Sequence, residues 1–356
     1  MINPYIIGRP VFDPEDFYGR KEELKDIVSD IRKLNSVSLV GERGVGCTSI
    51  LRYISHPKVI EEYFGSKSYR FLYLDFAGFS QCSQTQFWGE ILHGIKELAE
   101  QFKKTSVVNF LGNKDSSIME VYKIVDDFSR HDVKLLFFLD GFDKITRNQI
   151  FDKYFFDNLR HFITAYSNVA YVTASKKNLG DLGLPSDILS SPLFTYFTHK
   201  RIGFFRKGET EQLILGPSKR EGLEFNEEDI DFVFEVAYCH PLFVQSACHK
   251  IFKHRTNDGR IVGEKLREAT YERIRKELYQ NFENYFLHYW NSLHYDEKST
   301  LRDLCRSRIN KEKRRQVLGK LQDLCLIKEE NGECGPFSSL LREFCCNQRI
   351  PKDPFR

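Results

Sequence analysis

The strongest constraint on the fold is a near-continuous apolar segment, residues 134–140, which reads Lys-Leu-Leu-Phe-Phe-Leu-Asp. Apolar runs of this kind are typical of strands buried on both faces of a parallel sheet. Similar short segments occur at residues 36–40, 71–75 and 169–175, and residues 194–202 supply a candidate fifth strand. Amphipathic helical patterns separate these segments. The alternation predicts an α/β fold with an open, wound parallel sheet, whose binding crevice lies at the carboxyl ends of the strands.

Beyond the candidate fifth strand, helical patterns replace this alternation. We expect residues 1–205 to form the α/β domain and residues 206–284 to form a helical lid domain. Residues 285–356 contain a helix, a second helix, a hairpin and a closing helix, and an Asn331-Gly332 pair typical of a β-hairpin turn. This order of elements predicts a C-terminal winged helix.

Composition excludes several classes of protein. The chain has 53 Lys and Arg against 50 Asp and Glu, and this formal net charge of +3 does not predict a protein that coats a polyanion. Its 41% hydrophobic and 29% charged residues exclude a disordered chain. The chain has no apolar run of membrane-spanning length, no secretory signal and no CxxC motif among its nine cysteines. We therefore expect a cytoplasmic protein with free thiols and no membrane partner.

The first chemical motif is a glycine-rich turn, Gly41–Thr48, between the strand at 36–40 and the helix that follows it. Its spacing fits the phosphate-binding pattern G-x-x-x-x-G-K-[ST]. In such a loop the backbone N–H groups and the helix N-terminus bind phosphate, and the Thr48 hydroxyl is placed to bind Mg²⁺. We therefore expect ATP or ADP with Mg²⁺ as the ligands. The loop residues expected to contact the nucleotide are Gly41, Arg43, Gly44, Val45, Gly46, Cys47, Thr48 and Ser49.

Cys47 stands where this pattern requires a lysine. The missing ammonium would otherwise reach the β- and γ-phosphates and neutralise the charge that develops there. One interpretation is that Cys47 is a small replacement tolerated in a site that no longer hydrolyses ATP. The other is that Cys47 is redox-active, because the N-terminus of a helix stabilises a thiolate.

The second motif is the aspartate at the tip of the apolar segment, Asp140, which is expected to orient Mg²⁺ through water as a Walker B acid. Gly141 stands where a glutamate usually polarises the attacking water. Asp143 is a candidate substitute base, or alternatively a cap for the next helix. Ser175 ends the strand at 169–175, where its hydroxyl either senses the γ-phosphate or bonds to local backbone. Two replaced catalytic groups predict slow or absent ATP turnover.

These motifs together resemble the STAND and archaeal-type ATPases of the AAA-related P-loop NTPase class. Residues 17–24, with the sequence FYGRKEEL, are similar to the aromatic-Gly-Arg box of that class. The resemblance implies that Tyr18, Gly19 and Arg20 pack near the adenine and ribose. Residues 237–245 resemble the GGHPxxLQ motif, which implies that His240 and Pro241 approach the nucleotide at the start of a lid helix. A structural role for His240 is the alternative.

The C-terminal region resembles the same class at residues 324–327 and 336–341, which are similar to its G-L-I and F-S-x-L-L patterns. The resemblance implies a nucleotide-dependent switch, in which the ATP and ADP states differ in the packing of lid and winged helix. We therefore expect a switch or scaffold with weak or absent hydrolysis, acting in signalling or defence through a protein partner or self-association. The alternatives are an active AAA-type ATPase that uses Asp143 as its base, and a DNA-binding protein similar to replication initiators.

The DNA-binding alternative rests on charge. Residues 299–356 contain 13 Lys and Arg against 8 Asp and Glu, so the basic excess of the chain lies in the predicted winged helix. A solvated helix surface explains the same excess without a ligand. The candidate phosphate contacts are Arg306, Arg308, Lys311, Lys313, Arg314, Arg315 and Lys320.

Overall fold

The chain divides into two compact units, each described here by itself. Residues 11–17 and 21–202 form one, the sheet unit, and residues 1–10, 18–20 and those from 203 onward form the other, the helical unit. The computed structural model describes residues 1–65, 68–79, 82–100, 118–147, 150–189, 192–257, 260–263, 265–306 and 312–350. Residues 104–117, whose polar sequence predicts a loop, lie outside these residues, as do Arg308 and Lys311.

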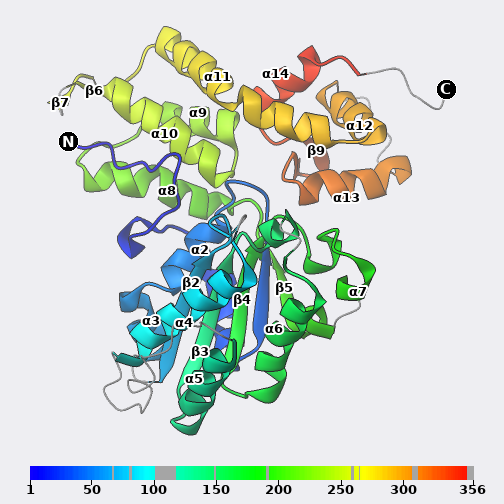
Figure 1. Ribbon diagram of the computed structural model, residues 1–356. Coiled ribbons are helices and arrows are strands. Elements are labelled where there is room, and N and C mark those ends of the chain that lie inside the picture. The colour runs from blue at the N-terminus through cyan, green and yellow to red at the C-terminus, as the bar shows by residue number, and fades with distance from the viewer. Residues whose placement is uncertain are drawn as a thin grey trace. The chain divides into compact units, whose positions relative to one another are not determined.

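The sheet unit contains a five-stranded parallel sheet with strand order β2-β3-β4-β1-β5, surrounded by helices (Figure 1). The predicted α/β fold is confirmed. Strand β3 is buried along most of its length, as its apolar sequence predicts. The strands are β1 (Ser36–Val40), β2 (Tyr69–Asp75), β3 (Lys134–Asp140), β4 (Val169–Ser175) and β5 (Phe197–Arg201).

The helices at residues 84–100, 118–130 and 153–165 of the sheet unit bury their apolar faces in a core rich in phenylalanine. The short helix α3, which begins with Pro57 as its first residue, was not expected from the periodicity. The α-helices are α1 (Lys21–Arg32), α2 (Cys47–Ile54), α3 (Pro57–Phe64), α4 (Gln84–Glu100), α5 (Ile118–Arg130), α6 (Lys153–Ala165) and α7 (Ser186–Leu189). The 3-10 helices are η1 (Pro14–Asp16), η3 (Phe142–Arg147), η4 (Leu179–Asp181) and η5 (Pro192–Tyr196).

The helical unit packs around one hydrophobic core that extends from Tyr5 to Cys345. The boundary expected between residues 284 and 285 falls inside one continuous helix, α11, so the backbone has no break there. The helices are α8 (Lys207–Arg220), α9 (Glu227–Ala237), α10 (Pro241–Arg255), α11 (Glu268–Ser292), α12 (Tyr295–Cys305), η6 (Glu312–Arg314), α13 (Arg315–Asp323) and α14 (Ser339–Asn347). The short strands are β6 (Thr256–Asn257), β7 (Arg260–Ile261), β8 (Ile327–Glu330) and β9 (Glu333–Pro336).

The hairpin expected at the Asn331-Gly332 pair is confirmed. Strands β8 and β9 pair antiparallel, and both turn residues have positive φ, 52° for Asn331 and 77° for Gly332. Those angles are the ones a two-residue type I′ turn requires. The elements α12, α13, β8–β9 and α14 follow in the order on which the winged-helix prediction rests, and that assignment stays a prediction.

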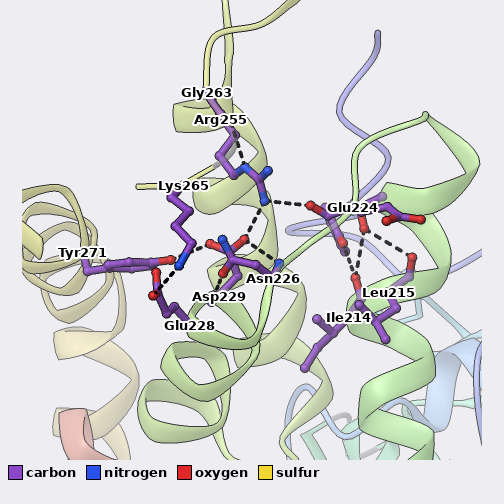
Figure 2. A network of polar contacts seen from close by, with 12 residues as sticks. Ile214, Leu215, Glu224, Asn226, Glu228, Asp229, Arg255, Gly263, Lys265 and Tyr271 are labelled. Atoms are coloured by element: carbon purple, nitrogen blue, oxygen red, sulfur yellow. Dashed lines mark hydrogen bonds and ion pairs between the residues drawn. The ribbon is translucent and has the colours of Figure 1, made fainter. Parts of the chain in front are cut away.

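A buried ion pair joins three helices of the helical unit (Figure 2). Arg255 of α10 lies 2.6 Å from Asp229 of α9, and the Tyr271 hydroxyl of α11 donates a hydrogen bond of 2.6 Å to the other oxygen of that carboxylate. The Arg255 guanidinium also donates to the carbonyl oxygen of Glu224. Both charges of the pair therefore have a partner, and the contacts connect α9, α10 and α11.

Among the described helices, none combines the length and the apolar character that crossing a bilayer requires.

Candidate nucleotide site

The glycine-rich loop has the backbone shape that its sequence predicts. Gly46, at the N-cap of α2, has φ of 106°, a value that L side chains rarely adopt. A Cβ on Gly41 would lie 2.6 Å from the carbonyl oxygen of Ile202 and 2.8 Å from Cys47 Sγ, so only glycine fits there. The Gly41 N–H donates to the carbonyl oxygen of Ser175 (3.1 Å). The loop is therefore anchored to both neighbours of β1, and the N-terminus of α2 follows it directly.

Cys47 is the first residue of α2, and its side chain is partly buried. Its sulfur packs against Gly41 at the start of the loop. Of the neighbouring residues, Val45 is buried and Arg43 is exposed. Ser49 Oγ accepts a hydrogen bond from the Val11 N–H (3.1 Å), so the segment 11–17 lies along α2.

The structure brings together the two residues predicted to hold Mg²⁺. The Thr48 hydroxyl donates to Asp140 Oδ1 at 3.0 Å, and Asp140, the last residue of β3, is only 8% exposed. A hydroxyl and a carboxylate beside a phosphate-binding loop fit Mg²⁺, which takes one or two protein oxygens together with phosphate and water. The described residues contain no group of three or more His, Cys, Asp or Glu that could hold a metal ion.

Tyr73 completes the contacts of Asp140, and the sequence analysis missed it. Its hydroxyl, from β2, donates to Asp140 Oδ2 at 2.6 Å. The guanidinium carbon of Arg52, on α2, lies 3.5 Å from the centroid of the Tyr73 ring. Burial raises the pKa of Tyr73, and the hydrogen bond to the Asp140 carboxylate raises it further, so the phenol stays protonated and donates. Finding Tyr73 requires knowing that β2 neighbours β3.

The position after Asp140 has an unusual neighbour. Gly141 has φ of 66°, and a Cβ built there would lie 2.9 Å from Lys144 Nζ. The same ammonium lies 3.8 Å from Asp75 Oδ1, and Asp75 is paired in register with Asp140. A cation therefore occupies the space in which a glutamate side chain at residue 141 would begin.

Asp143 and Ser175 were each predicted with two alternatives. Asp143 lies in the first turn of η3 and does not cap α6, because Asp152 is the cap of that helix. The Ser175 hydroxyl donates to the carbonyl oxygen of Lys177 at 2.6 Å. This contact is the local backbone bond foreseen as the alternative to γ-phosphate sensing.

Tyr18, Gly19 and Arg20 lie in the helical unit, whereas residues 1–205 were expected to form one domain. The Arg20 N–H donates to Glu209 at 2.5 Å, and its guanidinium donates to the carbonyl oxygen of Gly203, also at 2.5 Å. The Tyr18 ring packs against Gly216, where an added Cβ would lie 2.4 Å from a ring carbon. These contacts join residues almost 200 positions apart, so local sequence patterns could not reveal them.

His240 is fully buried in the core of the helical unit, at 0% exposure. Its Nε2 lies 3.2 Å from the Tyr285 hydroxyl, and the rings of Phe243 and Phe337 pack around it. Burial lowers the pKa of His240 to about 3, and the charge of Arg20 acts in the same direction. A neutral, buried ring fits the structural role that was the alternative, and contact of His240 with nucleotide stays a prediction. Pro241 is the first residue of α10, as expected.

The basic residues predicted to contact DNA are partly paired within the protein. Arg314 forms an ion pair with Asp303 at 3.0 Å and donates to the Thr300 hydroxyl at 2.8 Å. Lys320 forms an ion pair with Glu297. Arg306 and Arg315 are exposed. Arg308 and Lys311 lie outside the described residues, and the Lys313 side chain is not described.

Solved structures of two ATP-related proteins share the fold of this chain over almost its whole length. The Walker-type ATPase PABY2304 of Pyrococcus abyssi is 15% identical, with a TM-score of 0.65 over 95% of this chain and 98% of that one. The ORC2 protein of Aeropyrum pernix, solved as ADPNP and ADP complexes, is 12% identical, with a TM-score of 0.57 over 94% and 96%. This chain has the P-loop NTPase fold.

The P-loop NTPase is also similar to a family of STAND proteins. Residues 121–289 match the family model described as Novel STAND NTPase 2. The resemblance predicted from the motifs is therefore confirmed. The matched range contains Asp140, Ser175 and His240 but not the loop Gly41–Thr48. No curated protein matches the sequence.

Proposed function

We propose that this P-loop NTPase binds ATP or ADP with Mg²⁺, hydrolyses ATP slowly or not at all, and acts as a nucleotide-dependent switch through a protein partner. One observation carries the proposal. The phosphate-binding loop and the Thr48–Asp140 pair are intact, whereas the two catalytic positions beside them hold Cys47 and Gly141. Binding parts are thus retained and hydrolytic parts are replaced.

Nucleotide binding follows from the geometry of the loop. The N–H groups after Gly41 and the N-terminus of α2 provide donors and a partial positive charge for phosphate. Thr48 and Asp140 would hold Mg²⁺, which neutralises phosphate charge when bound. Tyr73 and Thr48 together keep the Asp140 carboxylate in one orientation. The nucleotide bound to the ORC2 protein supports an adenine nucleotide as the ligand.

Slow hydrolysis follows from two missing side chains. Without a lysine at residue 47, no ammonium from the loop stabilises the charge that develops on the γ-phosphate. Removal of one such preorganised donor typically lowers kcat about 10²- to 10³-fold. Gly141 has no side chain to orient the attacking water. The Lys144 ammonium beside it cannot replace a glutamate as the base, because an ammonium group cannot accept a proton.

The switch role rests on the STAND resemblance and on a large helical unit with its own core. We propose that the output reaches a protein partner in signalling or defence, and that the protein acts in the cytoplasm. None of the nine cysteines forms a disulfide in the structure, which supports a reducing compartment. DNA binding is a weaker candidate, because Arg314 and Lys320 already have acidic partners.

The test is the nucleotide content and the turnover of the purified protein. Denaturation followed by chromatography should release ATP or ADP, and turnover should be far below that of AAA-type ATPases. Asp140→Ala should weaken Mg²⁺-dependent binding. A normal AAA-type rate that Asp140→Ala abolishes would contradict the proposal and favour the active-ATPase alternative with Asp143 as base.

A further inference from the structure

The replacement of the Walker B glutamate by Gly141 has a structural consequence. Measured from a Cβ built on Gly141, Lys144 Nζ lies at 2.9 Å, its Cε at 3.0 Å and its Cδ at 3.3 Å. The end of the Lys144 side chain therefore lies over the Cα of Gly141. Any larger residue at 141 would displace it. The glycine that removes the catalytic base is the same residue that admits an ammonium.

This ammonium lies at the same edge of the sheet as the phosphate-binding loop. Gly141 directly follows Asp140, whose carboxylate accepts the Thr48 hydrogen bond. Lys144 belongs to η3, which begins right after β3 ends. The position therefore combines a positive charge, a nearby loop built for phosphate and a partly open surface, because the Lys144 side chain is 36% exposed.

The Lys144 ammonium is only loosely held by Asp75. Their separation of 3.8 Å exceeds the 2.7–2.9 Å typical of a charge-assisted hydrogen bond. The Asp75 side chain is 52% exposed, so water screens the pair. Asp75 Oδ1 also accepts a hydrogen bond from the Ala77 N–H at 2.8 Å. A phosphate group carries more charge than this carboxylate and would compete effectively for the ammonium.

We propose that Lys144 supplies the cation that the loop lacks at residue 47 and binds the terminal phosphate of ATP. The site then distinguishes a triphosphate from a diphosphate, because ADP has no group for this lysine. The lysine ammonium is a compact positive charge with three N–H donors, so it can donate hydrogen bonds to phosphate oxygens from several directions. This inference rests on the proposed nucleotide-binding function.

The experiment compares affinities for Mg²⁺-ADPNP and Mg²⁺-ADP by calorimetry. Lys144→Met should weaken ADPNP binding about 10- to 100-fold, the range for loss of one charged hydrogen bond. ADP binding should change less than about twofold. Lys144→Arg should restore part of the ADPNP affinity. Lys134→Met is the matched control, because Lys134 begins the same strand, β3, at the opposite end, with Nζ 4.9 Å from the centroid of the Tyr69 ring.

The outcomes separate the two proposals. Wild-type protein that binds neither nucleotide would overturn both the function and this inference. Wild-type protein that binds both, with Lys144→Met weakening them equally or not at all, would overturn the inference and leave the function standing. Lys144→Gln is the second neutral variant if Lys144→Met does not fold, and an unchanged ADP affinity verifies that either variant retains the loop.

Discussion

Asp140 illustrates how much of the candidate site depends on single residues. Its two carboxylate oxygens accept one hydrogen bond each, from Thr48 of α2 and from Tyr73 of β2. Arg52 lies over the Tyr73 ring one helical turn after Thr48, so one face of α2 contributes to both contacts. A buried carboxylate with fixed partners holds one orientation, which favours metal binding over rearrangement.

Tyr73→Phe tests this arrangement. The change removes one hydrogen bond and leaves Asp140 Oδ2 without that donor, while the ring contact with Arg52 remains. We expect the free energy of unfolding to fall by about 1–2 kcal/mol and the Mg²⁺-dependent part of nucleotide binding to weaken several-fold. Urea unfolding and binding with and without EDTA measure both effects. Tyr154→Phe, at a ring that is 76% exposed, is the control and should change neither.

Cys47→Lys tests what the loop has lost. A lysine here would have to leave the position of the thiol against Gly41 and extend toward the phosphates. We expect ATP to bind about 10- to 100-fold more tightly, because a charged hydrogen bond contributes about 1.5–3 kcal/mol. Turnover should stay low, because Gly141 still provides no base. Cys47→Ala controls for removal of the thiol, and an ATP affinity equal to that of Cys47→Ala would speak against the interpretation.

At the scale of elements, the buried Asp229–Arg255 pair of Figure 2 connects two helices of the helical unit, α9 and α10. A second ion pair, Glu228–Lys265, uses the preceding residue of α9 and has a length of 2.8 Å, but both of its side chains are exposed. The two pairs have similar lengths and different surroundings. Burial, rather than distance, should decide how much each contributes to stability.

Asp229→Ala should therefore destabilise the protein by about 3–5 kcal/mol, since it leaves Arg255 charged and buried without its carboxylate. Glu228→Ala should cost about 0–1 kcal/mol. Chemical denaturation of the two variants side by side measures the difference. Equal losses in the two variants would show that burial is not the deciding factor.

At the scale of the whole molecule, the chain has two hydrophobic cores, one in each unit. Nucleotide binding can therefore stabilise one unit while a change of pH affects the stability of the other. The nucleotide site belongs to the sheet unit, whereas His240 belongs to the helical unit. The pKa of His240 is lowered to about 3 by burial. Burial lowers the pKa of His249 and His254 in the same unit as well.

This arrangement predicts a pH dependence with a definite sign. Below about pH 6.5 the unfolded chain binds a proton on His240, whereas the folded chain stays neutral there down to about pH 3. The contribution of the neutral His240 to the free energy of unfolding is therefore fully present above about pH 6.5. Below that pH the free energy of unfolding falls by about 1.4 kcal/mol per pH unit for this one proton. Urea unfolding between pH 7.5 and pH 5 measures the slope.

His240→Gln should reduce that slope by about one proton, even though it also lowers stability at neutral pH. The control is His93→Gln, because the His93 side chain is 72% exposed. A slope unchanged by His240→Gln would mean that other groups carry the pH dependence.

Several elements could be predicted from the sequence because their signals are local. Apolar runs in the sequence predicted the positions of β1, β3 and β4. The Asn331-Gly332 pair predicted the hairpin, because these residues tolerate the positive φ that the turn requires. The spacing of Gly41, Gly46 and Thr48 located the loop. Such patterns depend on neighbours within a few residues, which is why they can be read without a structure.

The sequence by itself determined the α/β class, the phosphate-binding loop and the absence of lysine and glutamate from their catalytic positions. The tertiary structure alone decided which residues meet Asp140, that Lys144 occupies the space at Gly141, and that Tyr18–Arg20 join the helical unit. Strand order and chain crossings depend on the packing of segments far apart in the sequence. No local pattern encodes those contacts, because burial selects them only after the elements have formed.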